Sequence, residues 1–84
     1  PNVVVLGEDL VGGMGTPGGP EAIGGIWSTS TGLFAKFGKD RVIDTPISES
    51  AIVGAAAGLA LAGKRPVAEL MFADFVGVCL DQIW

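Results

Sequence analysis

Residues 3–6, Val-Val-Val-Leu, form an uninterrupted apolar run, and this run constrains the fold more than any other feature of the chain. A strand with apolar side chains on both faces is typical of a parallel sheet that helices cover on both sides. Strand-like and helix-like segments then alternate along the chain, as crossover connections between parallel strands require. We therefore expect an α/β fold in which a parallel sheet is flanked by helices.

The sequence predicts three strands and three helices. The strands are expected at residues 3–6, 41–43 and 66–72, and the helices at residues 31–37, at residues 49–62 and from Asp74 or its neighbour onward. Ser28, Thr29 and Ser30 are candidate N-caps for the first helix, and Ser48 for the second. Gly63 is placed where a helix often ends in the left-handed conformation. Residues 11–25 are rich in glycine and proline, so we expect an irregular loop there.

Composition excludes several classes of function. The 84 residues allow one small domain, and 9 acidic against 5 basic residues leave no basic surface for nucleic acid or for an anionic membrane. With no histidine and one cysteine, the chain lacks a disulfide framework, a Cys/His zinc site and a histidine proton relay.

The chain is unusually apolar for its size. Hydrophobic residues make up 49% of it, yet the longest uncharged apolar stretch, residues 51–62, is shorter than the roughly 20 residues that a membrane span needs. We expect a piece of a longer polypeptide whose apolar surface is covered by other parts of the protein.

Acidic residues follow each predicted strand, where ligands bind in open parallel sheets. They are Glu8, Asp44 with Glu49, and Asp74. Glu49 lies in the first turn of an apolar helix, so its carboxyl group could be partly desolvated and suited to handling a proton. The alternative is that it only complements the helix dipole.

Other patterns are ambiguous between packing and function. Gly54 and Gly58, one helical turn apart, predict close approach by another helix, or simply a tight core. Gly13–Gly18 has the spacing of a dinucleotide fingerprint, with Asp44 as a possible ribose ligand, but prolines interrupt it and we interpret it as chance. Cys79 is expected to be a buried small hydrophobe.

Two aromatic residues flank the last of these acidic positions. Phe72 and Phe75 bracket Asp74, and their rings could stack on a planar heterocycle or pack in the core. The pattern alone does not choose between these two uses.

Longer stretches resemble the pyrimidine-binding domain of thiamine-diphosphate-dependent dehydrogenase beta subunits. The resemblance lies in Asp40–Glu49, in Gly54 and Gly58, in Ala62–Pro66, in Phe72–Phe75 and in Asp81–Ile83. It extends over nearly the whole chain, so that residues 1–84 are expected to be part of one such domain, incomplete at this length.

The resemblance also implies a set of site residues. Glu49 matches the catalytic glutamate that hydrogen-bonds the N1′ nitrogen of the cofactor's aminopyrimidine. A proton held there helps the exocyclic nitrogen to take the proton from the thiazolium ring. Phe75 matches the ring that stacks on the aminopyrimidine, Ile47 the residue beside it, and Glu8 an acidic neighbour in the pocket.

The same resemblance implies a cofactor and partners. Thiamine diphosphate would be shared with an alpha subunit, whose Gly-Asp-Gly segment binds magnesium and the diphosphate, so this chain is expected to have no metal site. Two alpha and two beta chains would form a heterotetramer that passes a two-carbon unit to a lipoyl acyltransferase core. No nucleic-acid or membrane partner is expected, and the setting would be a bacterial cytoplasm.

Within the family, Met14–Gly18, Ala68–Phe72 and Gly77–Cys79 look most like the acetoin dehydrogenase type. A pyruvate or branched-chain 2-oxo acid dehydrogenase beta subunit is the alternative among enzymes. From another class, the chain could be a noncatalytic α/β nucleotide-binding or interaction module built on the glycine-rich loop.

Overall fold

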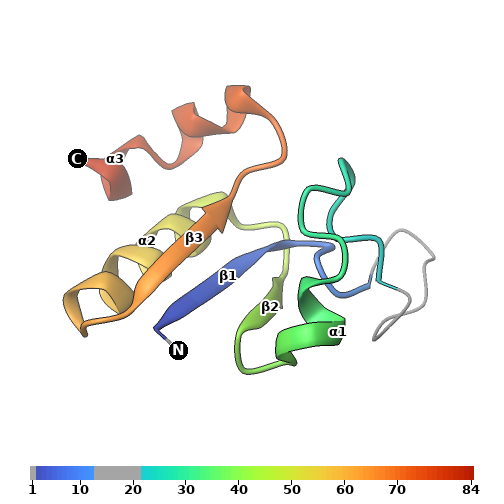
Figure 1. The fold of residues 1–84 in the computed structure, drawn as a ribbon. Coiled ribbons are helices and arrows are strands. Elements are labelled where there is room, and N and C mark those ends of the chain that lie inside the picture. The colour runs from blue at the N-terminus through green and yellow to red at the C-terminus, as the bar shows by residue number, and fades with distance from the viewer. Residues whose placement is uncertain (1, 13–21) are drawn as a thin grey trace.

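The computed structural model describes residues 2–12 and 22–84. Within these residues the strands are β1 (Val3–Glu8), β2 (Val42–Thr45) and β3 (Arg65–Glu69), and they form one parallel sheet in the order β2-β1-β3 (Figure 1). The helical elements are α1 (Leu33–Phe37), α2 (Glu49–Leu61), the 3₁₀ helix η2 (Ala73–Val78) and α3 (Leu80–Ile83). The predicted α/β class with a parallel sheet is confirmed.

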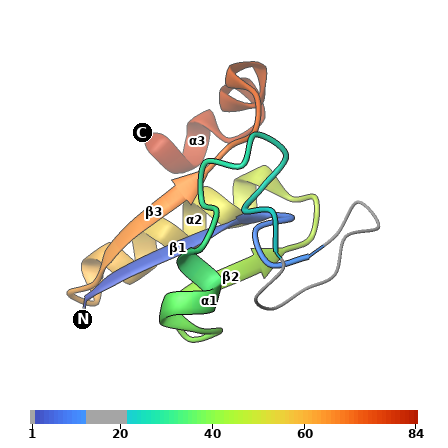
Figure 2. The same ribbon diagram turned by 45° about the vertical axis from the view of Figure 1, so that its right-hand side comes forward.

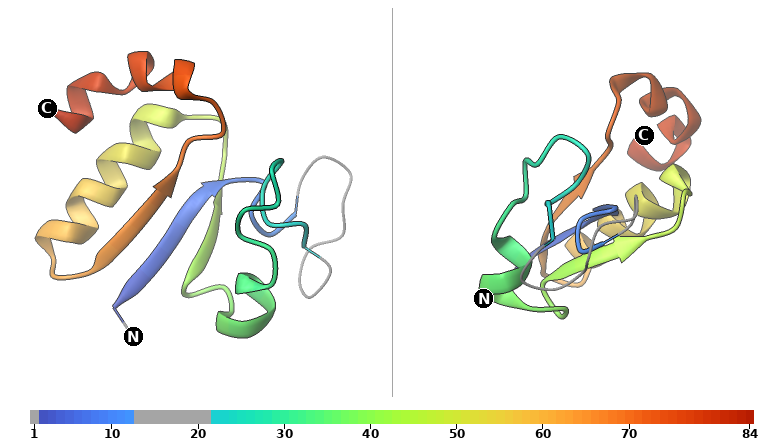
Figure 3. Two further views of the ribbon diagram at one scale, coloured as in Figure 1. Left: turned by 45° about the horizontal axis from the view of Figure 1, so that its top comes forward. Right: turned by 90° about the vertical axis from the view of Figure 1, so that its right-hand side faces the viewer.

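The two faces of the sheet have different neighbours. Val4 and Leu6 of β1 are buried on the side of α2, as is Ile52 of α2 itself. The alternate residues Val3 and Val5 face the other side, where α1 lies (Figure 3). The alternation of side chains along a strand thus divides β1 between two helical layers.

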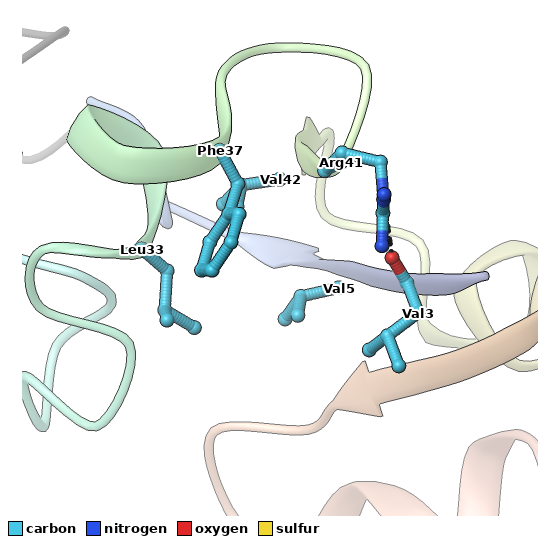
Figure 4. A pocket seen from close by; sticks show the side chains of 6 residues that line it. All are labelled: Val3, Val5, Leu33, Phe37, Arg41 and Val42. Atoms are coloured by element: carbon cyan, nitrogen blue, oxygen red, sulfur yellow. Dashed lines mark hydrogen bonds between the residues drawn. The ribbon is translucent and has the colours of Figure 1, made fainter. Parts of the chain in front are cut away.

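An apolar recess lies between α1 and the sheet. Figure 4 shows the side chains that surround this space of about 340 Å³, which are Val3, Val5, Leu33, Phe37, Arg41 and Val42. Arg41 is the polar member of the group, and its Nε donates a hydrogen bond to the carbonyl oxygen of Val3 at 2.5 Å. Leu33 and Phe37 therefore share the face of α1 that lies toward the sheet.

Helix α2 begins and ends close to its predicted bounds. Ser48 precedes it without a side-chain capping bond, and Gly63, with φ +89°, follows the last turn as expected. Although apolar and small residues surround the whole helix, Ile52 is its buried residue, and Leu61 is 91% exposed. A helix that is apolar all round needs cover on several sides, and the described residues supply it from the sheet and from η2 and α3 while leaving Leu61 open.

The last predicted helix is wrong as a single element. The segment instead forms η2, a break at Cys79 and then the short helix α3. Val76, Gly77 and Val78 explain the difference, because a glycine between two β-branched residues disfavours a continuous α-helix. In this segment the structure buries Cys79, while Val78 and Ile83 are exposed.

Three smaller boundaries also differ from the prediction. Strand β2 continues through Asp44 and Thr45, which pair with the end of β1, and β3 ends at Glu69 rather than at Phe72. Helix α1 begins at Leu33 after Gly32 as its N-cap, without a side-chain cap from residues 28–30. Serine and threonine hydroxyl groups favour local backbone partners in loops as readily as at helix caps, and Thr31 bonds in this way to Ile23 and Ser28.

Candidate functional site

Two of the predicted site residues, Glu8 and Glu49, come together at the carboxyl end of the sheet. Glu8 is the last residue of β1 and faces α2, whose first residue is Glu49. Glu8 is 8% exposed, and burial raises the pKa of its carboxyl group above the ordinary value. The charge of Glu49, a side-chain hydrogen bond with Glu49 and the charge of Asp9 raise the pKa further. The Glu8 carboxyl group therefore holds a proton more readily than a solvated carboxyl does.

Thr45 adds a hydroxyl group to the same corner. It pairs with Glu8 across the sheet, and paired residues of parallel strands point to the same face. Its Oγ1 is buried and has no hydrogen-bond partner within the residues that the structure describes. A buried hydroxyl without a partner costs about 1–3 kcal/mol, so this corner suits a group that brings polar atoms with it. Thr45 was not predicted as a site residue, because a threonine at the end of a strand is common.

Phe75 lies on η2 and is half-buried. Its ring packs edge-to-face against Phe72, with centroids 5.8 Å apart and planes at 88°. Element η2 lies against α2, and the Ser50 Oγ of α2 donates a hydrogen bond to the Val78 carbonyl oxygen at 2.6 Å. The ring is thus carried next to the helix that begins with Glu49.

Ile47 lies between β2 and α2 and is 84% exposed. Its side chain projects from the connection between β2 and α2. Ile47 is therefore near the carboxyl pair because it precedes Glu49 by two residues in the chain. Asp74, considered beside Phe75, is exposed. Cys79 is fully buried, with its Sγ 3.3 Å from the Phe75 carbonyl oxygen, as expected for a small hydrophobe.

Of the two α2 glycines that predict a close approach by another helix, Gly54 and Gly58, one has such a neighbour among the described residues. A Cβ at Gly54 would lie 2.7 Å from Oε1 of Gln82 in α3, so the predicted close approach by another helix is confirmed there. A Cβ at Gly58 would meet no described atom within 4 Å. The absence of a side chain at Gly54 thus leaves the space that the Gln82 amide fills.

Asp44 fixes the loop that follows β1. Its carboxylate accepts hydrogen bonds from the backbone N–H groups of Val11, at 2.6 Å, and Gly12, at 3.0 Å. The glycine-rich segment 13–18, considered as a dinucleotide fingerprint, lies outside the described residues. The carboxylate that would have bound a ribose is occupied with the backbone of its own chain.

A second group of contacts at this end of the sheet was not predicted. The Thr29 hydroxyl donates a hydrogen bond to the Glu69 carboxylate, and the Trp27 Nε1 donates to the Met71 carbonyl oxygen at 2.7 Å. The sequence offered one signal for Glu69, because this glutamate is the single charged residue in the apolar strand predicted at 66–72. Nothing in the pattern of residues 22–32 indicated that this loop returns to β3.

Neither a metal nor a membrane is indicated by the part of the chain that the structure describes. In residues 2–12 and 22–84, no three His, Cys, Asp or Glu side chains are grouped so as to hold a metal ion. No helix formed by these residues has the length and apolar character required to cross a membrane.

Known proteins similar to this chain identify its family. Residues 1–84 match the family described as "Transketolase, pyrimidine binding domain". The chain is 60% identical over its whole length to the acetoin:2,6-dichlorophenolindophenol oxidoreductase subunit beta of Cupriavidus necator, of which it covers 25%. Over 98% of the chain it is 49% identical to the protein of the same name from Bacillus subtilis, again covering 25%.

A relative of another name is nearly as similar. The 2-oxoisovalerate dehydrogenase subunit beta of B. subtilis is 46% identical over 96% of the chain, which covers 22% of that protein. The chain thus spans about a quarter of the length of the curated relatives it matches. Because residues 1–84 match the family model and the described strands form a parallel sheet, the chain belongs to the family of the transketolase pyrimidine-binding domain.

Proposed function

We propose that this chain is part of the beta subunit of the thiamine-dependent component of an acetoin dehydrogenase complex, with residues 1–84 forming part of its pyrimidine-binding domain. The observation that carries the proposal is the carboxyl pair of Glu8 and Glu49 at the carboxyl end of the sheet. The two acetoin oxidoreductase beta subunits among the relatives support the narrower assignment.

The described residues fit the aminopyrimidine half of thiamine diphosphate. Glu49 provides a carboxyl group for a ring nitrogen, the half-buried Phe75 provides a face for stacking, and Thr45 provides a buried hydroxyl whose Oγ1 has no partner among the described residues. When bound, the cofactor supplies the nucleophilic carbon that attacks the substrate carbonyl.

The contribution of this chain to the chemistry is to hold a proton. Glu49 is proposed to share a proton with the N1′ nitrogen of the aminopyrimidine. Glu8 supports that role because its raised pKa makes its carboxyl group easier to protonate, and a protonated Glu8 would not repel the carboxylate of Glu49. Phe75 and Ile47 would orient the ring so that this nitrogen meets Glu49.

The rest of the active centre is proposed to come from an alpha subunit. That subunit would bind magnesium and the diphosphate, in a heterotetramer of two alpha and two beta chains in a bacterial cytoplasm, and a lipoyl acyltransferase core would accept the two-carbon unit. Large apolar side chains that are exposed in this chain support the proposal that other parts of the protein cover them. Among them are Trp27, Ile47, Leu61, Val67, Val78, Leu80, Ile83 and Trp84.

The substitution Glu49→Gln tests the proposal in the full-length beta subunit assembled with its alpha partner. An amide cannot take up and release the proton, so acetoin-dependent dye reduction should fall by about a hundredfold or more. Asp40→Asn, a change of the same kind at an exposed loop position, is the control and should leave turnover unchanged. Near-normal turnover of Glu49→Gln would contradict the proton role.

A pyruvate or branched-chain 2-oxo acid substrate is the alternative, and the 2-oxoisovalerate dehydrogenase relative favours its consideration. Turnover of the assembled enzyme with acetoin, pyruvate and 3-methyl-2-oxobutanoate decides between them. A noncatalytic nucleotide-binding or interaction module is less well supported, because Asp44 binds loop amides in place of a ribose.

A further inference from the structure

The loop before α1 is joined to the end of β3 by side chains. Figure 2 shows this loop beside the segment that follows β3. The Thr29 hydroxyl donates a hydrogen bond to the Glu69 carboxylate, and the Trp27 indole donates to the Met71 carbonyl oxygen. The Trp27 ring also packs edge-to-face against Phe72, with centroids 5.7 Å apart and planes at 77°. Residues far apart in the sequence therefore hold one another in place.

Both oxygens of the Glu69 carboxylate lie against the loop, and one of them is hydrogen-bonded to it. While Oε1 accepts from Thr29, Oε2 lies close to the backbone of Gly25, where an added Cβ would approach it to 2.7 Å. Gly25 has φ +84° and its N–H donates to the Asp9 carbonyl oxygen at 3.1 Å. The loop is thus bonded to the rest of the fold at Gly25 and at Thr29, and Trp27 lies between these two points.

The contacts continue from the loop to the ring that is proposed to bind the cofactor. Phe72 packs edge-to-face against Trp27 on one side and against Phe75 on the other. Because Phe72 follows β3 in an extended conformation and is 42% exposed, the strand alone does not hold its ring. Trp27 supplies one of the walls against which Phe72, and through it Phe75, is packed.

We propose that the hydrogen bond between Thr29 and Glu69 is a positioning device for Phe75. By holding residues 25–29 on β3, it sets Trp27 against Phe72 and Phe72 against Phe75. Thr29, Glu69 and Trp27 are positioning residues that act through Phe75. This inference rests on the proposed function, in which Phe75 stacks on the aminopyrimidine.

The test uses the full-length beta subunit assembled with its alpha partner, with thiamine diphosphate and Mg²⁺ as the probe. Thr29→Val removes the hydroxyl at nearly constant volume and should raise the cofactor's Kd and its KM by about threefold to tenfold, as expected for one weakened aromatic contact. The kcat at saturating cofactor should stay within about twofold, because no reacting group is changed. Thr29→Ser keeps the hydroxyl and should bind like the wild type.

Two further variants separate positioning from general loop damage. Ser28→Ala changes an exposed hydroxyl in the same loop, for which no hydrogen bond is found among the described residues, and it should leave the Kd unchanged. Trp27→Leu removes the ring that transmits the effect, so adding Thr29→Val to it should weaken binding little further.

Wild-type affinity in Thr29→Val, or effects of Thr29→Val and Trp27→Leu that multiply, would overturn the positioning role. The result for Glu49→Gln is independent, since it is read in turnover. Weakened binding in Thr29→Val beside normal turnover in Glu49→Gln would leave the positioning role standing and remove the proton role. Absence of cofactor binding by the wild-type enzyme would overturn both.

Discussion

Gly54 and Gly58 occupy equivalent positions one turn apart in α2, yet the structure predicts opposite outcomes when each receives a side chain. At Gly54 a Cβ would lie 2.7 Å from Gln82 Oε1, whereas at Gly58 no described atom lies within 4 Å. A residue other than glycine inside a helix gains about 0.5–1 kcal/mol of helix stability. The cost of contact decides whether that gain survives.

Alanine and leucine probe this cost at two sizes. The atom nearest to a Gly54 Cβ is the end of an exposed, flexible glutamine, so Gly54→Ala should change the free energy of unfolding by less than about 1 kcal/mol. Gly54→Leu should destabilise by about 1–3 kcal/mol, because turning the Gln82 amide aside does not make room for a whole branched side chain between α2 and α3. Gly58→Leu, as the matched change, should leave stability within about 1 kcal/mol of the wild type or raise it.

Urea unfolding of the beta subunit, followed by circular dichroism, measures these differences through the midpoint at constant slope. Repeating the measurement after assembly with the proposed alpha subunit shows whether that partner covers Gly58, because Gly58→Leu would then weaken assembly. Equal unfolding free energies for Gly54→Leu and Gly58→Leu would refute the assignment of Gly54 as the contact point for α3.

Three further predictions concern the carboxyl end of the sheet. Asp44→Ala should lower the free energy of unfolding by about 1–3 kcal/mol in a denaturant titration, because two backbone N–H groups lose a charged acceptor. Asp44→Asn should lower the free energy of unfolding by less, because its amide oxygen still accepts a hydrogen bond. Because the pKa of Glu8 is raised on folding, its contribution to stability is greatest below its ordinary pKa and is lost as the pH rises through the raised value. The wild type should therefore lose stability relative to Glu8→Gln over that pH range, and parallel pH profiles would contradict this. Phe75→Ala should weaken thiamine diphosphate binding by about 1 kcal/mol or more in equilibrium titrations, and unchanged affinity would leave Phe75 a packing residue.

The sequence was sufficient for the elements that local pattern determines. Strand β1 begins at Val3 and helix α2 spans Glu49–Leu61, close to the predicted 3–6 and 49–62, because the pattern and end signals of these segments are strong. The last helix was wrong because its apolar spacing fits an α-helix, while Val76, Gly77 and Val78 lower the propensity to form one. Pattern and propensity disagreed there, and propensity prevailed.

The candidate site divides in the same way. Glu8 and Glu49 could be expected to meet, since both follow the ends of parallel strands. The pairing of Thr45 with Glu8 depends on the register of β1 and β2, and the bond between Thr29 and Glu69 depends on the path of a loop. Neither register nor loop path is encoded in the spacing of a single segment, which is why these residues were found in the structure alone.

The strand order β2-β1-β3 also determines when this sheet can form. The central strand is the first to be synthesised, and its partners at Val42–Thr45 and Arg65–Glu69 come much later in the chain. During synthesis β1 must wait for these two partners, and its run of valines is the kind of segment that associates with other chains while it is unpaired. Formation of this three-stranded sheet therefore depends on long-range pairing that is possible only once β3 has been synthesised, which makes it slow and sensitive to protection of the nascent chain.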